Sequence, residues 1–143
     1  MVKVTDVQMS EVSQERNLLI NALNVLEEGI HIVDSHGNTI FYSKGLEKIE
    51  KFKSANVLGK HISEAYKLDD ESSVLLKVLK TGITVKNYET TYMTSTGKTI
   101  SIITNTYPIY ANGSVAAAVS VNKDITNKKT MTETILKLQK QLY

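Results

Sequence analysis

The chain has 143 residues, of which 41% are hydrophobic and 22% are charged, a composition typical of a single globular domain with its own core. Its 17 basic and 15 acidic residues are too closely balanced to predict direct binding to nucleic acid or to a membrane surface. The lack of cysteine excludes disulfides, thiolate metal ligands, cysteine nucleophiles and cysteinyl-flavin photochemistry. With no targeting segment or membrane-length apolar run in view, we expect a soluble, cytoplasmic protein.

The first long element is predicted to be a helix over residues 10–28, with Ser10 as its N-cap. Its apolar residues cover more than the single stripe that packing on one surface requires. One stripe fits a heptad seam and is predicted to contact a partner chain, and a second stripe is predicted to cover a face of the sheet. The predicted dimer contacts on the seam are Leu19, Leu23 and Leu26. We assign residues 1–27 to this capping and dimerisation helix.

The middle of the chain alternates short strands with short helices. Strands are predicted at 29–34 and 39–42 around a turn, followed by short helical pieces near 46–52, 55–59 and 62–66. A clearer helix is predicted over 69–80, because acidic residues occupy its first turn and Gly82 follows its end.

Three consecutive strands are predicted at 85–94, 98–110 and 114–123, joined by glycine-containing turns at 95–97 and 111–113. Strands at both ends of a helical middle predict an α+β domain with one five-stranded antiparallel sheet, short helices on one face and an amphipathic helix at each end.

One face of the last three strands carries an unusual number of polar groups. This row consists of Tyr88, Thr90, Tyr92, Ile102, Thr104, Thr106, Ala118, Ser120 and Asn122. If the row faces the interior, each unpaired polar group would cost about 1–3 kcal/mol. Two explanations are open at this point: the groups pair with each other and with buried water, or they bind a small polar ligand.

The last segment, 127–143, is predicted to be a helix whose apolar residues are spaced 4, 3, 4. They are Met131, Ile135, Leu138 and Leu142. An isolated helix of this length is marginal in water, so we expect it to pair with its twin in a parallel dimer, or alternatively to fold back onto its own sheet. We assign residues 125–143 to a signalling helix of the coiled-coil type and residues 28–124 to a sensor domain.

Six short motifs in order resemble the PAS domain family, over residues 26–126. They are GIHIVD at 29–34, HGN at 36–38, VLGK at 57–60, TGK at 96–98, PI at 108–109 and DIT at 124–126. One departure is Ser43, where many PAS domains have asparagine.

Three stretches are more narrowly similar to the N-terminal sensory domain of RocR-type regulators of arginine utilisation. They are HIVDSHGNTI at 31–40, KN at 86–87 and TYPI at 106–109. This resemblance implies a sensor that acts with sigma-54 RNA polymerase through an AAA+ ATPase and a helix-turn-helix domain, neither of which is in these residues.

The family resemblance also implies which side chains meet the ligand. Asn122 matches the glutamine with which flavin-binding PAS domains contact their cofactor, and His31, Val33, Tyr92, Ile102 and Thr104 turn toward the cavity. Haem-binding PAS proteins use a histidine on the long middle helix; 69–80 has none, so we expect no haem. The predicted ligand-binding residues are His31, Tyr42, Tyr88, Thr90, Tyr92, Thr104, Thr106, Ser120 and Asn122, with Asp124 and Thr126 relaying the signal.

The leading prediction is a homodimeric sensor that binds a small polar metabolite, with amino-acid-like molecules among the candidates. The alternative is a ligand-free dimerisation or docking module of a signalling protein such as a sensor kinase, in which His31 is a core histidine bonded to a hydroxyl. No metal site is expected. Without a nucleophile elbow, phosphate loop or paired acid and base, we expect no enzyme activity.

Overall fold

The computed structural model describes residues 6–66, 73–93 and 97–142, with all of their side chains except those of residues 6–9, 66 and 92. Within them, five strands form a single antiparallel sheet in the order β2-β1-β5-β4-β3, and this confirms the predicted α+β class. The strands are β1 Gly29–Asp34, β2 Thr39–Tyr42, β3 Val85–Met93, β4 Thr99–Ala111 and β5 Ser114–Asp124.

Strands β4 and β5 form an antiparallel hairpin, and the turn between them accounts for how they pair. Asn112 and Gly113 both have positive φ, at 53° and 79°, as the tight turns between twisted strands require. This turn matches the predicted one.

The edge strand β3 departs from the regular strand that the sequence predicts. Its register against β4 shifts between Val85 and Tyr88, and Asn87 has a φ of 56°. The Asn87 amide donates to the Asn105 side-chain oxygen at 2.8 Å, which holds the extra residue in place. A bulge of this kind changes the direction in which the following side chains point, and Tyr88 is the first of them.

Three short α-helices pack on the inner face of the sheet: α2 Lys44–Glu50, α3 Ile62–Tyr66 and α4 Val74–Thr81. The 3-10 helix η1 Ser54–Asn56 lies between α2 and α3 in the chain and has no buried residue. Two apolar clusters join the α-helices to the strands. One brings Leu46 and Ile49 of α2 against Ile100 and Ile102 of β4, and the other joins α3 and α4 to β1 and β5.

Ser43 ties the helical layer to the sheet. It is completely buried, and its hydroxyl oxygen accepts the backbone N–H of Leu46 at 3.2 Å, which caps α2, and that of Ile30 at 2.8 Å. The serine that replaces the expected family asparagine therefore satisfies one donor from the helix and one from β1.

Four predicted helix ends are wrong. The helix α1 spans Asp6–Val25, so Ser10 lies inside it and Glu28 beyond it. Lys51 adopts the left-handed conformation at φ 61° and ends α2 before Phe52. The helix α4 begins at Val74 because Ser73 is extended and its hydroxyl caps the Leu76 amide, whereas residues 67–72, including most of the predicted acidic first turn, lie outside the described residues.

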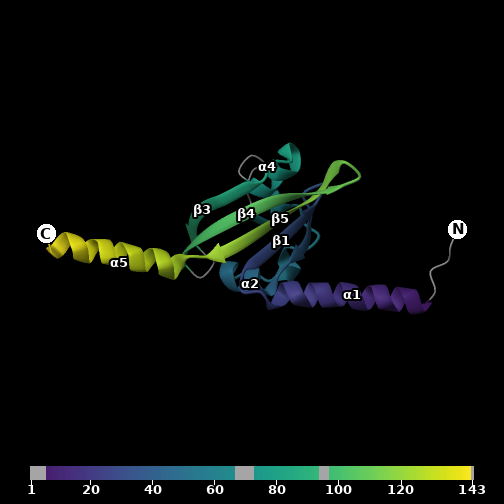
Figure 1. Cartoon of the computed structure of the whole chain (residues 1–143), viewed down its shortest axis with the longest axis horizontal. Helices are drawn as coiled ribbons and strands as arrows, with labels where there is room; N and C mark the ends of the chain where they lie inside the picture. Colours follow the sequence, from purple (N-terminus) through teal and green to yellow (C-terminus); the bar gives the residue numbers. More distant parts are fainter. Residues whose placement is uncertain (1–5, 67–72, 94–96, 143) are drawn as a thin grey trace.

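The terminal helices α1 and α5 (Thr126–Leu142) run in opposite directions (Figure 1), although both join the sheet at the end where Gly29 pairs with Asn122. The main partner of α1 is α2, where the Asn24 side chain accepts the Lys44 amide at 3.0 Å. The second apolar stripe, which consists of Leu18, Ala22 and Val25, does not cover the sheet as predicted, since Leu18 and Val25 are 68% and 78% exposed. No helix within the described residues has both the length and the apolar character needed to cross a membrane.

Candidate functional site

A cavity of about 440 Å³ lies between the inner face of the sheet and the short helices. The sequence predicts seven of its polar lining residues: His31, Tyr88, Thr90, Thr104, Thr106, Ser120 and Asn122. The polar row of the last three strands therefore faces inward, and this orientation follows from the period of two along each strand.

The outcome differs for the other two predicted ligand-binding residues, Tyr42 and Tyr92. Tyr42 is buried in the apolar cluster around α2 and does not line the cavity. Its hydroxyl instead donates to Glu50 at 2.6 Å. The side chain of Tyr92 lies outside those that the structure describes, although its backbone pairs with Ile100 in the sheet.

Part of the polar wall is satisfied within the protein. The Thr104 hydroxyl donates to the Asn122 side-chain oxygen at 2.7 Å. The Asn122 amide nitrogen donates to the Gly29 carbonyl and to the Ser120 hydroxyl, both at 3.2 Å. For these groups the explanation by mutual pairing holds.

Thr106 is different. Its side chain is completely buried, it lines the same cavity, and its hydroxyl has no hydrogen-bond partner among the described residues. A buried hydroxyl without a partner is unfavourable by about 1–3 kcal/mol. Mutual pairing therefore does not account for the Thr106 hydroxyl.

His31 is neutral at physiological pH. Its Nε2 lies 2.8 Å from the Thr39 hydroxyl, and its ring meets that of Tyr42 edge-on with 5.5 Å between ring centroids. Burial removes water that would stabilise the charged form and lowers the pKa of His31 from 6.5 to about 4. The ring can therefore exchange hydrogen bonds with a ligand but brings no positive charge to the cavity.

Sequence analysis missed the helical side of the site, which includes Leu46, Glu50, Ile62 and Ser73. Glu50 adds a carboxylate, and no lysine or arginine is among the described residues that line the cavity. One signal was available: Glu50 follows Leu46 by four residues and so lies on the same face of α2. Among the described residues, no group of three or more metal-ligating acidic or histidine side chains comes together.

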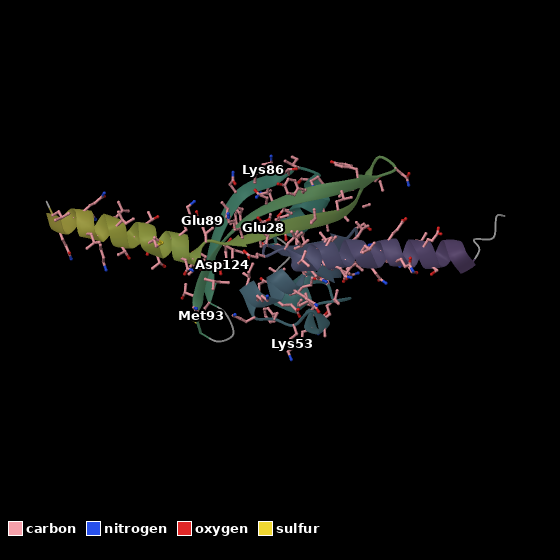
Figure 2. The ribbon with its side chains drawn as sticks, turned by 60° about the horizontal axis from the view of Figure 1, so that its bottom comes forward. Glu28, Lys53, Lys86, Glu89, Met93 and Asp124 are labelled. Carbon is pink, nitrogen blue, oxygen red and sulfur yellow. The ribbon has the colours of Figure 1, made fainter. Side chains whose placement is uncertain are left out.

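The predicted relay residues meet at the root of α5, where Figure 2 labels Asp124. The Asp124 carboxylate accepts the amide and the hydroxyl of Thr126 at 2.9 and 2.6 Å. The Thr126 hydroxyl oxygen in turn accepts the Ser101 amide at 2.9 Å. The first turn of α5 is therefore fixed to β4 as well as to β5.

Comparison with known proteins identifies this architecture. A family model described as a PAS domain matches residues 27–127. Transcriptional activator RocR of Bacillus subtilis is 35% identical over 105 residues, which are 73% of this chain and 23% of RocR. This chain therefore spans less than a quarter of that relative.

Solved structures share the fold at low sequence identity. The PAS domain of an HTR-like protein from Haloarcula marismortui is 16% identical, with a TM-score of 0.62 over 85% of this chain and all of that one. An RNA-binding light-oxygen-voltage receptor is 15% identical, with a TM-score of 0.67 over 91% of this chain and 39% of that one. A PAS domain related to a transcriptional activator is a sensory or regulatory module and not an enzyme. The chain belongs to the PAS domain family.

Proposed function

We propose that this chain is the ligand-sensing PAS domain of a bacterial transcriptional regulator and that it binds a small polar metabolite in the cavity between sheet and helices. The observation that carries the proposal is Thr106, which is among the residues that line a cavity of about 440 Å³ and whose buried hydroxyl has no partner among the described residues. A volume of that size lies within the range of small-molecule sites. A ligand that accepts or donates a hydrogen bond at Thr106 would remove the desolvation cost of its hydroxyl.

The charges of the lining favour a particular kind of metabolite. Glu50 supplies a carboxylate, His31 is neutral, and the remaining polar groups are hydroxyls and an amide. Such a lining favours an ammonium group beside Glu50 and hydrogen-bonding groups facing β4 and β5. An amino-acid-like metabolite has this chemistry.

The proposed output is a change in how two copies pack. The seam residues on both terminal helices are candidates for a homodimer contact, and all but the half-buried Leu23 are largely exposed. They are Leu19, Leu23, Leu26, Met131, Ile135 and Leu138. A ligand acts on such a dimer only if it binds one packing more tightly than another. Asp124 and Thr126 would pass this difference to α5, and in a complete regulator of the RocR type to domains that contact sigma-54 RNA polymerase.

The second candidate is a ligand-free dimerisation or docking module. The bonds from Asn122 to Thr104, Ser120 and Gly29 favour it, because they satisfy much of the polar wall without any ligand. It predicts that no small molecule copurifies with the chain or changes its stability.

The two candidates are separated by thermal unfolding with a panel of amino acids and polyamines, together with mass spectrometry of the denatured protein. A true ligand at 100 times its Kd should add about 2.7 kcal/mol to the free energy of unfolding. For a cationic ligand, E50Q should remove most of this gain, while E64Q, which alters an exposed glutamate on α3, should leave it intact. No shift with any compound and no copurifying molecule would leave the docking module as the function.

A further inference from the structure

The side chain of Lys129, in the first turn of α5, reaches the edge strand β3. Its Nζ lies 3.8 Å from the Glu89 carboxylate and donates to the Thr91 hydroxyl at 3.3 Å. Figure 2 shows Glu89 near the end of α5 that joins the sheet. The chain enters α5 from β5, so this contact connects α5 to a second strand that is not its neighbour in sequence.

The contact continues into β4 through Ser101. The hydroxyl groups of Thr91 and Ser101 are 2.9 Å apart, and the backbone of Ser101 accepts the Ile125 amide at 2.9 Å and donates to Thr126. Ser101 is 5% exposed, so these bonds lie beneath the first turn of α5. A continuous polar path therefore leads from β3 through β4 to the start of α5.

The same strand also forms part of the cavity wall. Tyr88 and Thr90 line the cavity, and the alternation of side chains along a strand places Glu89 and Thr91 on the opposite face. As an edge strand, β3 is bonded to the sheet only through β4, and its ladder is interrupted by the bulge at Asn87. A displacement of Tyr88 or Thr90 therefore moves Glu89 and Thr91 with the backbone.

From this arrangement we propose that β3 is a second relay, in which Lys129 is the positioning residue that couples the cavity wall to the orientation of α5 through Glu89 and Thr91. This inference rests on the proposed sensing function and adds to it a route that does not pass through Asp124. The Lys129 and Glu89 side chains are 41% and 51% exposed, so salt weakens their attraction and the contact is easily broken and remade. Such a contact sets the direction of α5 more than the stability of the fold.

The test is the distance between spin labels at K137C on α5 and K53C beside η1, measured by pulsed electron paramagnetic resonance. The natural chain has no cysteine, so only these two sites are labelled, and an excess of unlabelled chain suppresses distances between protomers. We expect K129M to broaden the distance distribution and K128M, at the neighbouring exposed lysine, to leave it unchanged. The charge exchange E89K/K129E should restore a narrow distribution.

The link to the cavity is tested without any ligand by T90L, which enlarges a side chain of the cavity wall. We expect T90L to shift the distribution in the natural background and to have little effect in K129M; T90I, which also enlarges the side chain, replaces T90L if that variant does not fold. An unchanged distribution in K129M, or an equal shift in both backgrounds, would overturn the proposal. Failure to find a metabolite would contradict the sensing function alone, because none of these measurements requires one.

Discussion

Thr104 and Thr106 lie two residues apart on β4 and both face the cavity, but their hydroxyls have opposite environments. The Thr104 hydroxyl donates to Asn122, and that of Thr106 has no partner among the described residues. We predict that T104V lowers the free energy of unfolding by about 1–3 kcal/mol, because it leaves the buried Asn122 oxygen without its donor. T106V, which removes a hydroxyl without a partner, should leave the stability unchanged or raise it by up to about 1 kcal/mol.

Chemical denaturation of the two variants without added ligand measures this difference, and each is the matched control for the other. An equal loss of stability in both would mean that the Thr106 hydroxyl already has a partner, and it would remove the main support for the sensing function.

His31 makes the stability depend on pH. Its pKa is lowered to about 4 by burial, so between pH 6.5 and 4 the unfolded chain binds a proton that the native chain does not. The free energy of unfolding should therefore fall as the pH drops through this window, by on the order of 3 kcal/mol for this group. Urea unfolding at several pH values, compared with H31Q, isolates the contribution.

A difference between the natural chain and H31Q that stays constant from pH 7 to pH 4 would show that His31 is protonated as readily in the folded state as in the unfolded one.

The residues that line the cavity were predictable where the alternation of side chains along a strand decides which face each one lies on. The inward row of β3, β4 and β5 follows from a period of two, whereas contacts made by short helices depend on how each helix is rotated. Glu50 was missed for this reason, because a carboxylate at the end of a short polar helix is typical of a solvated surface. Tyr42 was predicted to contact the ligand, but the pattern does not show that its ring is buried in the apolar cluster around α2.

At the scale of elements, Ser43 joins α2 to β1. Its hydroxyl oxygen accepts two backbone N–H groups and is completely buried. We predict that S43A lowers the free energy of unfolding by about 2–3 kcal/mol, because it removes the cap of α2 and leaves the Ile30 amide without its acceptor. Denaturant unfolding checks this, with S35A in the exposed turn after β1 as control. A loss below about 0.5 kcal/mol, as at an ordinary surface position, would contradict it.

The strands were predictable from the sequence to within one or two residues, and the helix ends were not. Strand ends are marked by turn residues such as Asn112 and Gly113, which need positive φ. Helix ends depend on caps that compete: Ser73 caps α4, although acidic residues upstream predicted an earlier start. The bulge at Asn87 gave no sequence signal that separates it from a regular strand position.

For the whole molecule, Ile135 and Leu136 allow a matched test of the proposed dimer, since they are neighbours on α5 with exposed fractions of 52% and 53%. Ile135 lies on the predicted seam with Met131, Leu138 and Leu142, and Leu136 does not. We predict that I135D reduces the dimer fraction in sedimentation velocity and that L136D leaves it unchanged, because a buried charge on the seam has no partner. Equal effects of both substitutions, or a monomer in the natural chain at every concentration, would contradict a dimer through α5.

The fold class and the family were predictable because the six sequence motifs and the order of predicted strands and helices both indicate a PAS domain. The opposite directions of α1 and α5 were not predictable, since they depend on a few contacts at each helix root. These are Asn24 with Lys44 for α1, and Thr126 with Ser101 and Lys129 with Glu89 for α5. A pattern of apolar residues predicts that a helix needs a partner, but it does not say where the helix points.

The charge of the cavity lining has a consequence for what the proposed sensor would ignore. Phosphorylated metabolites and nucleotides carry several negative charges, and the described lining offers them a glutamate and no cationic side chain. The Glu50 carboxylate would repel such anions and lower their affinity for the cavity. A sensor built on this cavity would therefore discriminate against phosphorylated compounds in favour of neutral or cationic ones.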